Sequence, residues 1–169
     1  MITTQLITLA DIRVVKSIAL NIHQDKELVP YILAAQNFDL QKFLGDSFYL
    51  DLLANIGNYN TLFNGGQYTY NGVTYVLNGL KDLIVYYTYA RYVNNSNVIA
   101  TPTGFVNKTN PYSEQVTEKT IARLVENVRN EAVFIEDNIK NFLDRNNSDY
   151  PLWLKCKINS NFRVKIRQV

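Results

Sequence analysis

Apolar residues recur at every third or fourth position along most of the chain, which is the spacing of one face of an α-helix. Residues that cap or break helices divide this pattern into separate segments. Thr8 is a good N-cap, Gly45 a good C-cap, and Pro30 is tolerated in a first helical turn. The predicted helices span residues 9–15, 25–45, 46–57, 79–94 and 113–147. The pattern therefore predicts a mainly α-helical protein.

Three short segments, and a longer one over 95–112, lack the helical spacing. The clearest β pattern is QYTYNGVTYVL, residues 67–77, in which a central Asn-Gly pair favours a two-residue hairpin turn. An isolated two-stranded hairpin is only marginally stable in water, so it must lean on the helices or on another subunit. Residues 16–22 alternate apolar and polar and are predicted to be extended, and residues 59–66 to form a short turn.

The segment 95–112 is predicted to be a long loop. It is polar, contains two prolines and has no apolar periodicity. Loops of this length inside compact domains are uncommon and are usually functional or disordered. The sequence leaves two interpretations open, a contact arm and a flexible connector.

The last predicted helix, over residues 113–147 with Ser113 as its cap, is unusually long. At about 1.5 Å per residue it spans roughly 50 Å, whereas a globule of this chain length is only about 40 Å across. We therefore expect the helix either to kink or to project and contact something else. Pro151 cannot continue a helix and marks the latest point at which it ends.

The net charge of +2 conceals an asymmetry along the chain. Residues 155–169 contain five cations and no acid, so the rest of the chain carries a net charge of −3. In the tail, Arg163, Lys165 and Arg167 alternate with apolar residues, which is typical of an amphipathic strand. Three roles remain open for this tail: docking onto another protein by strand addition, a solvated segment, and binding of nucleic acid.

The sequence offers little for catalysis. His23 is the only histidine and Cys156 the only cysteine, and no motif places a second group beside either one. The acidic pair Glu136 and Asp137 is most simply part of a solvated helix face. Walker, EF-hand and HExxH motifs are absent, and no apolar run reaches about 18 residues. We therefore expect no catalytic site, no metal site, no cofactor and no membrane span. An enzyme with an unrecognised acidic site stays as a rival hypothesis.

Several segments occur in an order that resembles a known family. They are LITLADIR, then LVPYILAAQNFDLQKFLGDSFYLDLL, then GLKDLIVYYTYARYV, then TPTGFVNK, then a long helix that ends in YPLW. This arrangement resembles the head–tail connector (adaptor) proteins of tailed bacteriophages, and most closely the type found in crAss-like phages. The similarity covers about residues 5–153, and it lies in helix-packing patterns rather than in catalytic motifs.

The resemblance implies a structural protein of the virion neck, assembled in the bacterial host cytoplasm. Such proteins form a ring, commonly of twelve subunits, below the portal vertex, where they continue the DNA channel and present a platform for further neck or tail proteins. Packaged DNA would be contacted nonspecifically at most. The alternative function is a small nucleic-acid-binding protein that uses its basic tail.

The resemblance also implies two domain-level parts and two sets of contact residues. Residues 1–153 would form the helical connector domain, and residues 154–169 a basic, extended docking tail. The residues expected to dock onto the portal or another partner are Phe162, Arg163, Val164, Lys165, Ile166 and Arg167. The residues expected in contacts between subunits are Tyr68, Tyr70, Tyr75, Thr101, Pro102, Gly104 and Phe105.

Overall fold

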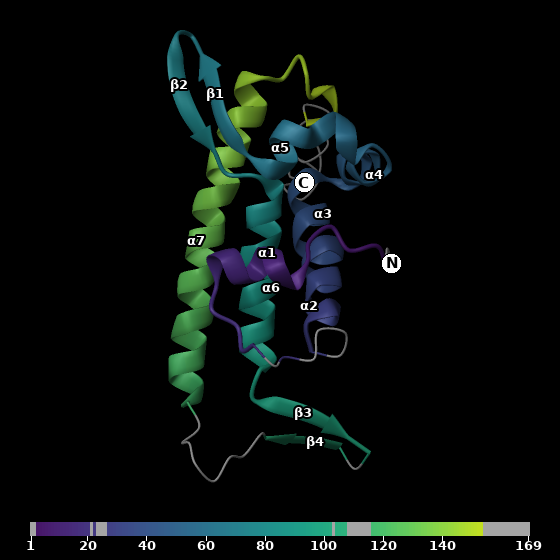
Figure 1. Ribbon diagram of the computed structural model, residues 1–169, viewed down its shortest axis with the longest axis vertical. Helices are drawn as coiled ribbons and strands as arrows, with labels where there is room; N and C mark the ends of the chain where they lie inside the picture. Colours follow the sequence, from purple (N-terminus) through teal and green to yellow (C-terminus); the bar gives the residue numbers. More distant parts are fainter. Residues whose placement is uncertain (1–2, 21, 23–26, 103, 108–115, 154–169) are drawn as a thin grey trace, which may run out of the picture.

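The computed structural model of the protein describes residues 3–20, 22, 27–102, 104–107 and 116–153. Two antiparallel helices, α6 (Leu80–Asn95) and α7 (Glu118–Arg145), lie side by side, and several of the shorter helices pack against α6 (Figure 1). The predicted fold class is confirmed, because the chain is mainly helical, with one long helix near its C-terminus and a small antiparallel hairpin.

The first helix, α1 (Leu9–Val15), begins at the predicted cap. The Thr8 hydroxyl accepts a hydrogen bond from the Asp11 amide, and the Asp11 carboxylate accepts one from the Thr8 amide at 2.7 Å, which together form a capping box. Asp11 also pairs with Lys81 of α6 at 2.6 Å, and Ile12 is fully buried. These contacts hold α1 across α6.

The segment predicted as one helix from 25 to 45 consists of consecutive helical pieces. Its end is as predicted, because Gly45 has a φ of +79°, a conformation that glycine adopts without strain. Pro30 lies in the first turn, also as predicted. The pieces are α2 (Val29–Ala34), a π-helical turn η2 (Ala35–Leu40) and α3 (Gln41–Leu44).

The π-helical turn, which the sequence did not predict, places Gln36 in the interior. Its side-chain oxygen accepts a hydrogen bond from the Leu6 amide at 2.8 Å, and its side-chain nitrogen donates one to the Thr4 carbonyl at 2.9 Å. Burial of a carboxamide costs free energy unless its polar atoms are paired. The two bonds therefore fix the N-terminal residues against the helix.

The segment 59–66, predicted as a short turn, is largely helical. Its Asn and Gly residues are typical of turns, but Leu62 and Phe63 are buried in the core, and this burial stabilises a helix too short to form alone. The prediction was wrong because tertiary packing outweighed local preference. The helices of this region are α4 (Asp46–Ala54), η3 (Ile56–Tyr59) and α5 (Asn60–Asn64).

The hairpin predicted over residues 67–77 is confirmed. Its strands pair antiparallel with Tyr68 opposite Tyr75, and the two residues of its Asn-Gly turn have positive φ angles of 50° and 76°, as a type I′ turn requires. We call this element the upper hairpin, formed by β1 (Gly66–Tyr70) and β2 (Val73–Leu77).

At the root of the upper hairpin, the backbone before β1 and the backbone after β2 come into close contact at Gly65 and Gly79. A Cβ atom at Gly65 would lie 2.5 Å from the carbonyl oxygen of Leu77, and one at Gly79 would lie 2.3 Å from the carbonyl oxygen of Phe63. No side chain fits at either position without moving the backbone. The close approach therefore holds the hairpin root directly against the end of α5 and the start of α6.

The prediction of a long loop over 95–112 is wrong for its described central part, which is a second hairpin. Its strands pair antiparallel with Thr101 opposite Gly104. β-Branched residues before and after the turn favour strands, but the turn lacks the Asn-Gly signal that identified the upper hairpin. We call this element the lower hairpin, formed by β3 (Val98–Thr101) and β4 (Gly104–Asn107).

α7 is shorter than the predicted helix 113–147. Its N-cap is Thr117, whose hydroxyl accepts a hydrogen bond from the Thr120 amide, whereas the predicted cap Ser113 lies outside the described residues. The 28 residues of the helix span about 42 Å. α7 is one continuous helix, and none of residues 118–127 is fully buried. The helix therefore extends beyond the packed core.

Trp153 is the last described residue, and it is buried. Its ring lies 5.8 Å from that of Phe43, and its indole nitrogen donates a hydrogen bond to Asp144 at 2.7 Å. The tail over 154–169, with the predicted docking residues 162–167, lies outside the described residues, as do His23 and Cys156. The division into a helical domain and a docking tail stays a prediction.

Candidate interaction surfaces

One face of the upper hairpin packs on α7. The rings of Tyr68 and Tyr75 stack with their centroids 5.5 Å apart, and the Tyr68 ring also meets the edge of Phe142 at 4.9 Å. Arg145 donates a hydrogen bond to the Tyr68 hydroxyl at 2.7 Å, and its guanidinium lies 3.9 Å from the centroid of the Tyr75 ring. Both tyrosines, predicted as contacts between subunits, thus make contacts within the chain.

An amide side chain on α7 holds the base of the upper hairpin. Asn138 accepts a hydrogen bond from the Asn78 amide at 2.8 Å and donates one to the Val76 carbonyl at 2.9 Å. Neither Asn138 nor Arg145 could be identified from the sequence, because a polar residue on a helix does not indicate which strand it will contact.

The tip and outer face of the upper hairpin remain exposed. Tyr70 is 36% exposed, Val73 52% and Val76 63%. Apolar side chains exposed on a short sheet are typical of surfaces that contact a partner. The Tyr70 ring lies 5.7 Å from the Arg145 guanidinium, but Tyr70 is the most exposed of the three predicted contact residues of this hairpin.

The lower hairpin stands apart from the rest of the molecule. Within the part of the chain that the structure describes, no element outside the hairpin makes extensive contact with it. Thr101 donates a hydrogen bond to the Gly104 carbonyl at 2.7 Å, which closes the turn, and Pro102 is exposed. For Phe105, the structure describes only its position in β4. The predicted contact residues of this segment therefore lie on a projecting element.

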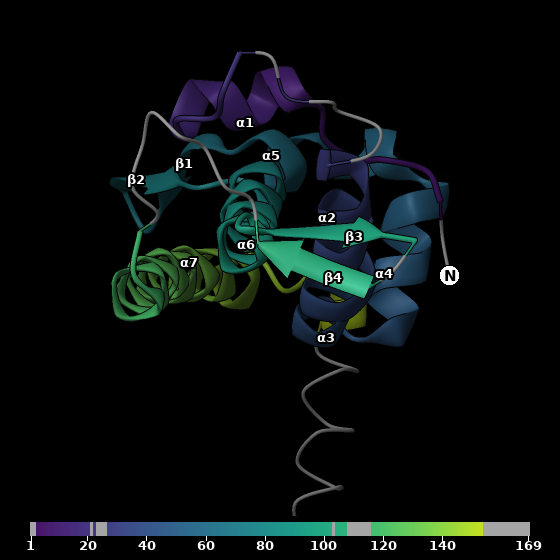
Figure 2. The same cartoon turned by 90° about the horizontal axis from the view of Figure 1, so that it is seen from below.

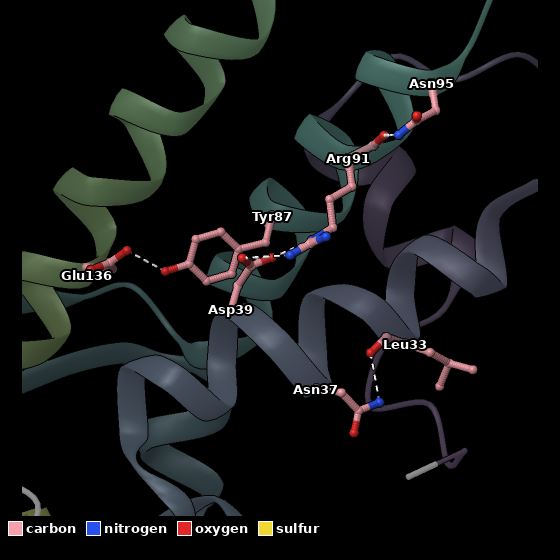
Figure 3. Close-up of polar contacts among 7 residues, drawn as sticks. All are labelled: Leu33, Asn37, Asp39, Tyr87, Arg91, Asn95 and Glu136. Carbon is pink, nitrogen blue, oxygen red and sulfur yellow. Dashed lines mark hydrogen bonds and ion pairs between the residues drawn. The ribbon is translucent and has the colours of Figure 1, made fainter. Parts of the chain in front are cut away.

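Polar contacts on both sides of α6 hold the helices at a fixed spacing (Figure 3). Arg91 makes two hydrogen bonds to the Asp39 carboxylate of η2, at 2.6 and 2.9 Å. On the other side, the Tyr87 hydroxyl donates to Glu136 of α7. Burial, together with the Glu136 carboxylate, raises the pKa of Tyr87 well above its usual value, so the hydroxyl stays protonated and remains a donor.

The apolar stripe of α7 continues past the end of the core. Val128, one helical turn further along α7, is only 3% exposed, but Leu124 is 42% exposed, and Ile121 and Val125 are half-buried. Residues three and four apart lie on the same helix face, so these side chains prolong the stripe that packs on α6. We call Ile121, Leu124 and Val125 the α7 stripe.

Charge is distributed unevenly between the two ends of the described body. The segments 42–78 and 136–153, which include the upper hairpin and the C-terminal half of α7, contain six acids and three bases, whereas the other described residues contain seven of each. The end that carries the upper hairpin is therefore acidic, and it is also the end from which the basic tail continues after Trp153.

A shallow cleft of about 200 Å³ between α1, α5 and α6 is lined by Asp11, Asn64, Lys81 and Asp82, among others. Burial opposes ionisation of Asp11, but hydrogen bonds from Lys81 and Thr8 outweigh it and hold the pKa of Asp11 below its usual value. Burial raises the pKa of Asp82. The lysine is already paired with Asp11, and this cleft presents no thiol, hydroxyl or imidazole nucleophile among these residues.

The described residues offer neither a metal site nor a helix that could cross a membrane. Among them, no three histidine, cysteine, aspartate or glutamate side chains are grouped so that they could hold a metal ion. No helix formed by these residues combines the length and the apolar character that crossing a membrane requires.

The chain was compared with known proteins and structures. No curated protein and no solved structure matches it. A family described as of unknown function (DUF6712) matches residues 40–163, a range that contains both hairpins, α6 and α7. Because the match spans well over half of its length, the chain belongs to the DUF6712 family.

Proposed function

We propose that this protein is a ring-forming head–tail connector of a tailed-bacteriophage virion. In this role, copies of the chain form a ring below the portal, continue the DNA channel and present a face to further neck or tail proteins. The protein then acts by assembly and not by catalysis. The sequence resemblance over residues 5–153 supplies the starting point for this proposal.

The observation that carries the proposal is the position of the two hairpins. They lie at opposite ends of the α6–α7 pair (Figure 1). Tyr87 ties α6 to α7 through Glu136, and Arg91 ties α6 to η2 through Asp39. A connector subunit must contact more than one molecule, and contact elements at both ends of its body allow this, the upper hairpin with one partner and the lower hairpin with a neighbouring copy. This architecture supports a connecting role.

The predicted contact residues have different roles in such a connector. Tyr68 and Tyr75 hold the upper hairpin on α7, while the exposed part of Tyr70 contacts another molecule. Thr101, Pro102, Gly104 and Phe105 form the end of the lower hairpin and contact a neighbouring subunit. The tail residues 162–167 dock onto the portal.

The charge of the body favours a channel through which DNA slides. Apart from the tail, the chain carries a net charge of −3. Phosphate binding by proteins depends on neutralisation by Lys and Arg, so a body of this charge binds DNA weakly. Salt-resistant DNA binding by an isolated ring of this chain would contradict this part of the proposal.

Cryo-electron microscopy of the neck of virions that carry this chain tests the proposal. We expect a closed ring of this chain against the portal, with the lower hairpin and the tail in contacts between molecules. A neck in which the density beside the portal belongs to another protein, with this chain absent from the particle, would refute it.

The five cations of residues 155–169 favour one second candidate, a small nucleic-acid-binding protein. Binding through these cations would weaken steeply as the salt concentration rises. Affinity for double-stranded DNA should therefore be measured over a range of salt concentrations with the full chain and with a variant that ends at Leu154. Strong, salt-sensitive affinity that the truncation abolishes would favour this candidate over the connector.

A further inference from the structure

The upper hairpin has one edge that no described element covers. In an antiparallel pair of strands, hydrogen-bonded residue pairs alternate with pairs whose backbone groups point outward. The pair that flanks the two-residue turn, Tyr70 and Val73, is hydrogen-bonded. By this alternation, Gln67 and Thr69 on β1 direct their N–H and C=O groups away from β2. We call these outward groups the β1 edge.

The other edge of the hairpin faces α7. The carbonyl of Val76 on β2 points outward by the same alternation, and it accepts a hydrogen bond from Asn138 of α7 at 2.9 Å. In both perpendicular views the upper hairpin lies next to α7 (Figures 1 and 2), and β2 is the strand that contacts the helix. The β1 edge is therefore on the side away from α7. Gln67 and Thr69 are exposed, and within the described part of the chain no hydrogen bond reaches their outward backbone groups.

An unpaired strand edge accepts a further strand through main-chain hydrogen bonds. A sheet of three strands with one apolar face is also more stable than a two-stranded one. The two faces of this hairpin differ, because Tyr68 packs on Phe142 of α7, whereas Gln67 and Thr69 lie on the opposite, polar face. A strand that fits the β1 edge therefore has apolar side chains on the α7 side and polar ones on the outer side.

The C-terminal tail of the chain has this alternation. Residues 162–167 read FRVKIR, three apolar residues interleaved with three cations. As a strand beside β1, this segment places its apolar side chains on the face of Tyr68 and its cations on the outer face, beside Gln67 and Thr69. The six residues also match the length of β1, which has five.

The tail begins close to the β1 edge. The Tyr150 ring lies 5.5 Å from that of Phe142, which lies 4.9 Å from that of Tyr68, so the end of the described chain is near the middle of β1. The eight residues between Trp153 and Phe162 span up to about 27 Å, whereas β1 is only about 17 Å long. A tether of this length keeps the concentration of the tail high at its own hairpin.

Charge favours the same pairing. The end of the molecule that carries the upper hairpin has six acids and three bases, and residues 155–169 have five cations and no acid. Attraction between opposite charges extends over about 10 Å at a salt concentration of about 0.1 M. We propose that residues 162–167 add to the β1 edge of their own chain as a third strand.

This seat for the tail does not depend on the proposed function, and it specifies one part of it. A tail on the hairpin keeps Arg163, Lys165 and Arg167 on the outer face, where they are available to the portal, while its apolar side chains are covered. The added strand also removes an unpaired edge through which the hairpin could join the sheet of another molecule.

Disulfide trapping within the isolated full chain tests the inference. In a background with Cys156→Ser, Thr69→Cys places one thiol on the outer face of β1, and a second cysteine is introduced at each of the positions 163–167 in turn. Because side chains alternate between the faces of a strand, mild oxidation should link Thr69→Cys to positions 163, 165 or 167. The link should be lost at positions 164 and 166. Peptide mapping identifies the bond, and migration on a non-reducing gel shows that it lies within one chain.

Thr74→Cys is the matched control. Thr74 is the cross-strand partner of Thr69, so it lies on the same face, and it is also exposed. It belongs to β2, however, and is one strand further from the added strand. A tail that only collides with the hairpin links both threonine positions equally, whereas a third strand at the β1 edge links Thr69→Cys and leaves Thr74→Cys unlinked.

Amide hydrogen exchange followed by NMR measures the same contact without cysteines. A variant that ends at Leu154 keeps the buried Trp153 and lacks the tail. If the tail supplies hydrogen bonds to the β1 edge, the amides of Gln67 and Thr69 should exchange roughly fivefold faster in this variant than in the full chain. The amide of Thr74, on the other edge, should exchange at the same rate in both.

The inference is overturned if the tail positions link without alternation, if Thr74→Cys links as well as Thr69→Cys, or if truncation leaves the exchange of Gln67 and Thr69 unchanged. Links that form only between chains also overturn it, because the occupant is then a second copy. The two proposals fail separately. A seated tail in a chain that is absent from the virion neck overturns only the proposed function, and a ring in the neck whose β1 edge is bare overturns only this inference.

Discussion

The contact between Arg91 and Asp39 provides a direct test of how firmly α6 is held. The substitution Asp39→Asn removes the charge and keeps the shape, and Arg91→Met keeps the aliphatic part of the side chain. Each change leaves one polar partner without its counterpart at a site where both side chains are largely covered, with exposures of 26% and 18%. We expect each single substitution to destabilise the fold.

The magnitude follows from the geometry. The guanidinium and the carboxylate share two hydrogen bonds, at 2.6 and 2.9 Å. A hydrogen bond to a charged group contributes about 1.5–3 kcal/mol when it is well shielded, and fully exposed ion pairs contribute about 0.2–1 kcal/mol. For this partly covered pair we expect a loss of about 2 kcal/mol for each single substitution. In a chain of this length that lowers the Tm by about 4–8 °C.

Urea unfolding followed by circular dichroism measures the effect. A double-mutant cycle with Asp39→Asn, Arg91→Met and the double variant isolates the coupling, which we expect to be at least about 1 kcal/mol. The control is Asp137→Asn, which removes a contact with Lys140 on the surface, where Asp137 is 63% exposed, and should cost less than about 0.5 kcal/mol. A coupling near zero, or a loss no larger than that of the control, would refute the reasoning.

Three further predictions concern single positions. Gly79→Ala puts a methyl group 2.3 Å from a backbone oxygen of α5 and should cost about 3 kcal/mol or more, while Gly57→Ala, with nothing within 4 Å, should change thermal stability little. Phe142→Ala, in the core, should cost about 3–5 kcal/mol in urea unfolding, and Phe134→Ala, at 71% exposure, about 0.5 kcal/mol or less. Because the folded state lowers the pKa of Asp11, its ionised form contributes stability that is present above the unfolded pKa and lost as the pH falls through the folded pKa. Asp11→Asn should therefore flatten the stability profile below about pH 4, and a variant as acid-sensitive as the wild type would contradict this assignment.

Much of the helical scaffold follows from local signals. The Thr8 cap, the glycine at 45 and the Asn-Gly turn each have one physical explanation, and each lies where it was predicted. The π-helical turn at Ala35–Leu40 does not follow from the sequence, because no side chain there favours a π-helix. The burial of Gln36 that accompanies this turn is evident only from the fold. The lower hairpin was missed because the sequence TPTG lacks the Asn-Gly signal of a two-residue hairpin turn.

The candidate surfaces are less predictable than the scaffold. A hairpin pattern separates two faces but does not say which one meets a helix, so Tyr68 and Tyr75 were assigned outward when they pack on α7. Apolar residues recur at helical spacing along the whole of α7, but the sequence does not state where α6 stops covering this face. Exposure at Leu124 depends on the length of a different helix, which only tertiary structure provides.

The close contact between the backbone at Gly65 and at Gly79 also limits how the sequence can vary between relatives. Neither position has space for a side chain, so relatives must either keep both glycines or have a different backbone at the root of the upper hairpin. The tip of that hairpin meets no such limit, and insertions there would lengthen the strands without changing the direction in which they leave the body. Relatives should therefore differ in how far the upper hairpin reaches and agree in where it points.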